Sequence, residues 1–182
     1  MIYILYAIYS IINLPMTLLA LLLSPILPLF ASDITGKINN GSRIGVGPRL
    51  PSWLNWFMTP DNSLYGDDSF IAVNSQSYLS QIKWLIRNPA YGFALYYIDG
   101  TSPATFSGDK TIKDNDNAKA GWCFVKAGGL FQFTWVQPIG FSRCLYVNFG
   151  WNIRALVDDN VNPKPNPYEA TFVCSPRLSG FR

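Results

Sequence analysis

The chain has 182 residues, and its 14 basic and 11 acidic side chains give a formal net charge of +3. Charged residues make up 14% of the chain and hydrophobic residues 49%, whereas an ordinary soluble domain has about 25% charged residues. The basic side chains are scattered, which argues against nucleic-acid binding, and the absence of histidine removes the usual general base and most zinc sites.

The first apolar stretch, residues 2–31, contains no charged side chain. A continuous apolar run longer than about 18 residues is typical of a membrane-spanning helix. Pro25 and Pro28 predict that this helix ends near Leu23, because proline cannot continue the helical hydrogen bonds. We therefore expect an N-terminal transmembrane helix, and contact with the lipid bilayer through residues 2–31.

Two alternatives to a membrane anchor exist for this stretch. A cleaved signal peptide needs a basic residue ahead of a shorter apolar core, and the chain has none before Lys37. A re-entrant hairpin turning at residues 13–15 would return both ends to one side of the membrane. Basic flanks tend to stay in the cytoplasm, so Lys37, Arg43 and Arg49 favour an uncleaved anchor with its N-terminus outside and its domain in the cytoplasm.

The remainder of the chain divides into a linker and one domain. Residues 32–49 are rich in Gly, Ser and Asn and lack an apolar period, which predicts a flexible linker. Residues 50–182 are long enough for one modest domain with its own core. At its start, residues 50–60 predict a short helix or turn whose large rings either lie at the membrane interface or fill the core.

A helix is predicted over residues 77–87, because apolar residues recur there at spacings of three and four and Asn88-Pro89 ends the pattern. Binding surfaces are enriched in aromatic and arginine side chains, which this helix and residues 50–60 both supply. The candidate interaction residues are Trp53, Trp56, Phe57, Trp84 and Arg87.

Beyond this helix the apolar period changes to two, which predicts half-buried strands. The clearest strands are residues 122–126, 130–136 and 145–151, and further candidates are 92–98 and 170–174. Residues 127–129 contain two glycines and predict a hairpin link. The predicted fold class is α+β, with an N-terminal transmembrane helix followed by a small antiparallel β-rich domain and one packed helix.

The segment TPDNSLYGDD, residues 59–68, holds the three aspartates Asp61, Asp67 and Asp68. Pro-Asp-Asn and Gly-Asp-Asp are turn sequences whose side chains bond nearby backbone amides, and the second precedes a strand-like FIAV at 70–73. The alternative is that the three carboxylates converge on a divalent cation, as in a metal-dependent hydrolase. Residues 114–117 resemble the start of a calcium loop but lack its later glycine and glutamate.

The three cysteines, Cys123, Cys144 and Cys174, are isolated on apolar strand-like runs and predict buried free thiols. One disulfide with a spare thiol is the alternative. Hydroxyl and thiol groups lack a histidine to activate them. The sequence therefore predicts a protein that is not an enzyme and has no cofactor or metal site.

Four strings are distinctive when taken together: LPSWLNWFMTPDNSLYGDD at 50–68, KWLIRNPAYGF at 83–93, RCLYVNFGW at 143–151 and FVCSPRLSGFR at 172–182. They resemble a family of small tailed-phage proteins that is described as a domain of unknown function and often as membrane proteins. The resemblance implies a phage-encoded origin, and it carries no catalytic residue or cofactor.

Taken together, these patterns predict a phage-encoded protein that is anchored in the host inner membrane and acts through protein or membrane interaction during infection. The alternative is a structural or genome-delivery component of the virion, in which the apolar segment packs against other particle proteins. The protein partner and the oligomeric state, including a homo-oligomer, stay open.

Overall fold

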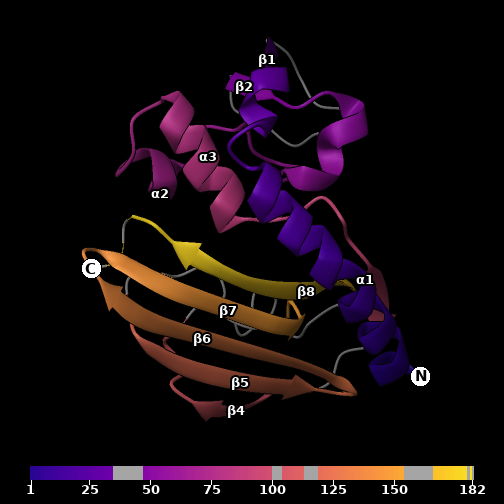
Figure 1. The fold of residues 1–182 in the computed structure, drawn as a ribbon. Helices are drawn as coiled ribbons and strands as arrows, with labels where there is room; N and C mark the ends of the chain where they lie inside the picture. Colours follow the sequence, from indigo (N-terminus) through magenta and orange to yellow (C-terminus); the bar gives the residue numbers. More distant parts are fainter. Residues whose placement is uncertain (35–46, 100–103, 113–118, 154–165, 180, 182) are drawn as a thin grey trace.

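The computed structural model describes residues 1–34, 47–99, 104–112, 119–153, 166–179 and 181 (Figure 1). Its helical segments are α1 (Ile2–Leu23), the 3-10 turn η1 (Leu27–Phe30), the 3-10 turn η2 (Ser52–Phe57), α2 (Asp68–Ile71) and α3 (Tyr78–Arg87). Its strands are β1 (Ser32–Ile34), β2 (Gly47–Arg49), β3 (Tyr96–Asp99), β4 (Ala104–Gly108), β5 (Gly121–Ala127), β6 (Leu130–Gly140), β7 (Arg143–Trp151) and β8 (Asn166–Arg177).

Six of these strands form one antiparallel sheet in the order β3-β8-β7-β6-β5-β4. Strands β4 to β8 pair with their chain neighbours, and β3 pairs along the outer edge of β8. In β6 the buried side chains alternate with partly exposed ones from Leu130 to Val136, because successive strand residues point to opposite faces. The predicted α+β class, with an apolar N-terminal helix, an antiparallel sheet and a further packed helix, is confirmed.

Helix α3 confirms the helix predicted over residues 77–87 and lies above β8 (Figure 1). Ser77 caps its N-terminus, since the Ser77 Oγ accepts a hydrogen bond from the Ser80 backbone N–H at 3.3 Å. At the other end, Ser175 Oγ of β8 donates to the Arg87 carbonyl oxygen at 3.0 Å. The last turn of α3 is therefore fixed against the buried side of the sheet.

Helix α1 ends at Leu23, where the prolines predict, and it contacts both α3 and β8. It is long and apolar enough to cross a membrane. The helix continues through Pro15, so the re-entrant hairpin at residues 13–15 was wrong. A proline within a helix removes one hydrogen bond but does not always end the helix, and here the packing of α1 against the domain holds it together.

The side of α1 that faces the domain is its polar side. Its fully buried positions recur at spacings of three and four, which marks one helical face: Tyr9, Asn13, Thr17 and Ala20. Asn13 Nδ2 donates to the Phe172 carbonyl oxygen at 3.1 Å, and the Tyr9 hydroxyl donates to the Phe93 carbonyl oxygen at 3.4 Å. Helix α1 is thus held to the domain by hydrogen bonds as well as by apolar contact.

Tyr6 connects α1 directly to the β-ladder. The Gly150 backbone N–H donates to the Tyr6 hydroxyl oxygen at 2.7 Å, and the Tyr6 hydroxyl donates to the Thr171 carbonyl oxygen at 2.8 Å. Gly150 and Thr171 are cross-strand partners in β7 and β8. Position 150 requires glycine, because its φ is +109° and a Cβ there would lie 2.1 Å from the Phe131 carbonyl oxygen.

Three local predictions need correction. Residues 70–73 were expected to be strand-like, but Phe70 and Ile71 belong to the helical turn α2, because the Asp67 side chain caps it by accepting from the Phe70 backbone N–H at 2.8 Å. The link between β5 and β6 is shorter than predicted, since Ala127 pairs with Leu130. The strand predicted at 92–98 begins only at Tyr96, as β3.

The predicted linker, residues 32–49, has paired ends. Ser32 lies opposite Arg49 where β1 and β2 pair, and residues 35–46 lie outside the described chain. Arg49 is buried and donates from Nη1 to the Asn62 carbonyl oxygen at 2.7 Å. The division into residues 1–31, 32–49 and 50–182 stays a prediction, and the contacts of α1 show that the first segment packs on the last.

Among the described residues, none of Cys123, Cys144 and Cys174 forms a disulfide, in agreement with the predicted thiols. Cys123 and Cys144 are buried, but Cys174 is exposed, so its predicted burial was wrong. The residues on either side of Cys174 in β8, Val173 and Ser175, are both buried. Because successive strand residues point to opposite faces, the Cys174 side chain lies on the other, exposed face.

We predict that Tyr6→Phe lowers the free energy of unfolding by about 1–3 kcal/mol, because it removes the hydroxyl that bonds both Gly150 and Thr171 and leaves two buried backbone groups unsatisfied. Urea unfolding of the full-length chain in a neutral detergent measures the change. The matched control is Tyr3→Phe, because Tyr3 is 59% exposed and its ring stacks on Phe131. Equal stability losses in the two variants would contradict the bridging role of Tyr6.

Candidate functional site

The outward side of α1 is entirely apolar. Eight large aliphatic residues on this side are exposed, and together they form what we call the α1 stripe: Ile4, Ile8, Ile11, Ile12, Leu14, Leu18, Leu19 and Leu22. The exposed fractions lie between 42% and 76%, and no charged residue occurs in residues 2–32. Helix α1 therefore turns its polar residues toward the protein and its apolar residues outward, the reverse of a helix on a water-soluble surface.

The α1 stripe continues into η1 and η2. Leu29 and Phe30 of η1 are exposed, and the Phe30 ring contacts the Trp53 ring with a centroid distance of 6.0 Å. Trp53 and Trp56 are 68% and 57% exposed, whereas Phe57 is buried in the core. Residues 50–60 were predicted to place their rings either at the membrane interface or in the core. The structure places both tryptophans on the surface and Phe57 in the core.

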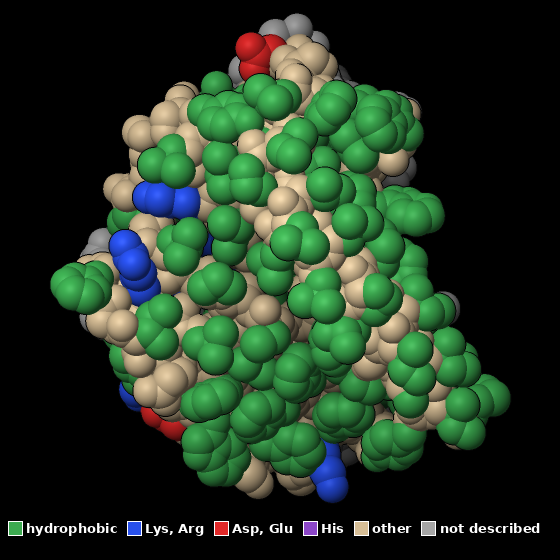
Figure 2. All heavy atoms as spheres, in the orientation of Figure 1, with side chains coloured by type: hydrophobic (Ala, Val, Ile, Leu, Met, Phe, Trp, Pro, Cys, Tyr) green, Lys and Arg blue, Asp and Glu red, His purple; other side chains and the backbone are tan. Residues whose placement is uncertain are grey.

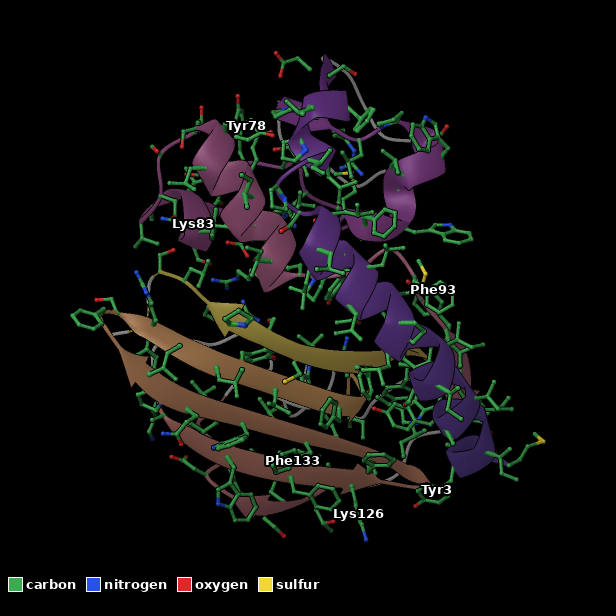
Figure 3. The ribbon with its side chains drawn as sticks, in the orientation of Figure 1. Tyr3, Tyr78, Lys83, Phe93, Lys126 and Phe133 are labelled. Carbon is green, nitrogen blue, oxygen red and sulfur yellow. The ribbon has the colours of Figure 1, made fainter. Side chains whose placement is uncertain are left out.

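One face of the sheet adds aromatic side chains to this surface. Four phenylalanines lie directly opposite one another across β5, β6, β7 and β8, and each is partly exposed: Phe124, Phe133, Phe149 and Phe172. We call them the phenylalanine row (Figure 3 labels Phe133 within it). The Tyr6 and Tyr3 rings of α1 lie 5.2 and 6.0 Å from the ring of Phe131, which neighbours this row in β6.

The apolar face, by which we mean the α1 stripe, Trp53, Trp56 and the phenylalanine row, is nearly free of charge. Figure 2 shows hydrophobic side chains over most of the side that carries α1, with acidic and basic side chains at its margins. Lys126 lies among the rings, with its Nζ 5.7 Å from the Phe124 ring centroid. Large exposed apolar surfaces are uncommon on soluble monomeric proteins and often belong to interaction sites, so the apolar face is a candidate for contact with lipid or protein.

A polar pocket lies between α3, the loop of residues 59–67 and the buried side of β7 and β8. It has a volume of about 160 Å³. Its lining is polar and includes Asp61, Asp67, Trp84, Arg87, Asn148 and Arg177. The pocket combines two basic and two acidic side chains from segments far apart in the sequence.

The two arginines of the polar pocket are almost completely buried. Arg177 is 4% exposed, and its guanidinium carbon lies 4.1 Å from the Tyr146 ring centroid. Burial, followed by the nearby Arg87 charge, lowers the pKa of Arg177 to about 9. Arg87 is 6% exposed, and its guanidinium carbon lies 5.8 Å from the ring centroids of Phe70 and Trp84.

Several buried donors in the pocket lining have no hydrogen-bond partner among the residues that the structure describes. They include the Nε of Arg177, the Nε1 of Trp84 and the Oγ1 of Thr59. Trp84 is 3% exposed, so water does not freely solvate its N–H. Buried polar groups are normally paired, and an unpaired donor beside a pocket indicates that a ligand or ordered water completes the site.

Two of the three aspartates singled out in the sequence line this pocket. Asp61 and Asp67 are in its lining, and Asp67 also accepts a hydrogen bond from Ser69 Oγ at 2.6 Å. Asp68 is exposed in the first turn of α2. Within the described ranges, no group of three or more His, Cys, Asp or Glu side chains is placed to hold a metal ion, and the calcium-like residues 114–117 lie outside those ranges.

Glu169 of β8 has an unusual environment that its sequence context does not indicate. Burial, opposed by a hydrogen bond from Asn152 and supported by the Asp61 charge, raises the pKa of Glu169 to about 7. Its side chain lines a small cavity of about 10 Å³ under α1, together with Tyr9 and Asn13. The only sequence signal was that Glu169 is the single glutamate of the chain.

The predicted interaction residues therefore occupy different places. Trp53 and Trp56 lie on the apolar face, Phe57 lies in the core, and Trp84 with Arg87 lines the polar pocket. Their common role as contact residues stays a prediction. Sequence reasoning did not single out Arg177, although it shares a strand face with the buried Ser175.

These features define an α+β protein with an apolar N-terminal helix that is a candidate membrane helix. The chain belongs to the family of unknown function DUF7338, whose model matches residues 1–178. The match spans α1 as well as the sheet, so helix and sheet belong to the same family unit. No curated protein and no solved structure matches the chain.

We predict that Glu169→Gln removes a pH dependence of stability between about pH 4.5 and 7. The folded chain keeps the Glu169 proton up to a pKa of about 7, whereas the unfolded chain loses it near 4.5, so the native chain loses stability as pH rises through this window. The variant should gain about 2–3 kcal/mol relative to the native chain at pH 8, and nothing at pH 4.5.

Urea unfolding at several pH values measures this difference. The matched control is Asp33→Asn, which removes an exposed carboxylate of β1 and should not reproduce the gain in stability of Glu169→Gln at pH 8. A Glu169→Gln variant whose stability follows the native pH profile would show that Glu169 is ionised in the folded chain.

Proposed function

We propose that this chain is a phage-encoded membrane protein without enzymatic activity. It is held at the cytoplasmic face of the host inner membrane by its apolar face and acts through protein or membrane interaction during infection. The observation that carries the proposal is the reversed polarity of α1, whose buried positions are Tyr9, Asn13 and Thr17 while its exposed positions are isoleucine and leucine.

The reversed polarity favours lipid as the surroundings of α1. Polar side chains of helices in a bilayer turn toward the protein, because lipid offers them no hydrogen bonds. Moving the eight residues of the α1 stripe from water into lipid contributes on the order of 10 kcal/mol, comparable to the whole stability of a typical domain. In water, this surface would drive self-association.

The docking of α1 favours a helix that lies along the bilayer surface. A helix that crosses the hydrocarbon layer of about 30 Å must leave the aqueous domain over most of its length. Helix α1 instead contacts β8 and α3 from Tyr6 to Ala20. We therefore propose that its outer side sinks into the interface, as in amphipathic surface helices, with Trp53 and Trp56 at headgroup level.

The side of the membrane and the phage origin rest on the sequence. Lys37 and Arg43 follow the apolar segment and favour the cytoplasmic side, while Arg49 is committed to backbone carbonyl groups inside the domain. The phage origin is supported by the resemblance of the four strings to tailed-phage proteins. A single-pass anchor remains the competing arrangement, and it requires α1 to leave β8.

The second candidate function is a component of the virion, and the phenylalanine row is what favours it. In this function, the partly exposed rings of the row pack against other particle proteins instead of lipid. The two functions differ in location. Stoichiometric copies in purified particles, measured by mass spectrometry, would support the virion function, whereas recovery with inner-membrane vesicles would support the first proposal.

We predict that the full-length chain floats with phospholipid vesicles in a density gradient and that Trp53→Ser with Trp56→Ser weakens its partitioning by tenfold or more, because the two exposed indoles contribute roughly 1.5 kcal/mol or more together. The readout is the fraction of protein that floats at a series of lipid concentrations.

The control for this test is Phe141→Ser. Phe141 is 92% exposed in the turn after β6, whereas α1 contacts Phe131 at the beginning of that strand. We expect Phe141→Ser to float like the native chain. Full flotation of the double tryptophan variant, or a native chain that stays monomeric and soluble without lipid or detergent, would reject the proposed membrane surface.

A further inference from the structure

We propose that the polar pocket binds a single phosphate group, held by the guanidinium groups of Arg87 and Arg177 with the indole N–H of Trp84. This site is separate from the apolar face, and the proposal does not depend on membrane placement. It rests on the pocket of about 160 Å³ and on two buried donors in its lining, the Nε of Arg177 and the Nε1 of Trp84, which have no hydrogen-bond partner among the described residues.

The need for an anion follows from the burial of Arg177. Burying a charge is costly unless an opposite charge or several hydrogen bonds compensate. The charges that act most strongly on Arg177 come from Arg87, Tyr146, Cys144 and Tyr91, and none of these is a carboxylate. An anion in the pocket would compensate the charge and accept from the Nε that has no acceptor among the described residues.

Phosphate fits this donor set better than other anions do. Arginine presents several N–H groups in a planar fork that matches phosphate oxygens, and phosphate has enough oxygens to accept from two arginines and an indole at once. The pocket volume of about 160 Å³ is well above the roughly 10–15 Å³ that a single water needs. This space suits one phosphate group with a small substituent.

The carboxylates in the same lining limit the charge of the ligand. Asp61 and Asp67 share the pocket with the arginines, so a polyphosphate would meet repulsion that a single phosphate group avoids. We therefore expect phosphomonoesters to bind and nucleoside triphosphates to bind more weakly. The phosphate group can come from a soluble phosphomonoester or from the headgroup of a phospholipid, and these two sources need separate experiments.

The experiment is calorimetric titration of the full-length chain in a phosphate-free maltoside detergent at pH 7.5. One arm uses glycerol 3-phosphate, and the second uses short-chain phosphatidic acid below its micelle concentration. We expect one site per chain and a loss of affinity of about tenfold or more in Arg177→Lys, because lysine cannot reproduce the fork of hydrogen bonds. We expect Trp84→Phe to weaken binding severalfold while keeping the ring contact with Phe70.

The variants are chosen so that folding and binding can be separated. Arg177→Lys keeps the charge, and its thermal unfolding without ligand reports whether the fold survives. Arg87→Lys is the second variant, for use if Arg177→Lys does not fold. The matched control is Arg143→Lys, which changes an exposed arginine at the start of β7 and should bind like the native chain.

Each outcome decides the proposal. Binding of glycerol 3-phosphate that depends on Arg177 or Arg87 supports a soluble phosphate ligand, and binding of phosphatidic acid alone with the same dependence supports a lipid headgroup. The proposal is overturned if neither compound binds, if both arginine variants bind like the native chain, or if acetate binds as tightly as phosphate. Flotation with vesicles is measured separately, so a failure of membrane binding does not enter this result.

Discussion

The Tyr6 hydroxyl is the contact on which the arrangement of this protein depends. It accepts from the Gly150 N–H and donates to the Thr171 carbonyl oxygen, and these two residues are cross-strand partners. A helix fixed in this way cannot rotate about its axis without losing both bonds. Its polar side therefore stays against the sheet, and the same constraint turns the α1 stripe outward, where the protein offers it no cover.

The reversed polarity of α1 also explains why the interior near β8 is polar. Asn13 bonds a backbone carbonyl of β8, Glu169 is partly buried beside a small cavity under the helix, and Arg177 is buried at the other end of the strand. Buried polar groups stabilise a fold only when they are hydrogen-bonded or paired. The apolar face and the polar pocket therefore have the same origin. In this part of the protein, polar side chains lie in the interior and apolar side chains lie on the outer surface.

The elements that could be predicted from the sequence are those with a clear local pattern of apolar residues. Helix α3 and strands β5 to β7 followed from apolar periods of 3.6 and two, whereas residues 70–73 were misassigned because the Asp67 cap outweighs their strand propensity. The docking of α1 could not be predicted, since Tyr6 and Thr171 are 165 residues apart. A signal was nevertheless present in the spacing of polar residues along α1. The pocket was missed because Arg87 and Arg177 meet only through the packing of α3 on β8.

The most direct test is the depth of α1 in a bilayer, measured by electron paramagnetic resonance of single spin labels in a Cys174→Ser background. The labelled positions are Ile4, Ile8, Ile11, Leu18 and Leu22. Positions 4 and 22 are about 27 Å apart along a helix. We predict equal, shallow depths at all five labels, with contact to lipid-soluble oxygen. A profile that deepens toward Ile11 and becomes shallow again at both ends would show a spanning helix and contradict the docked arrangement.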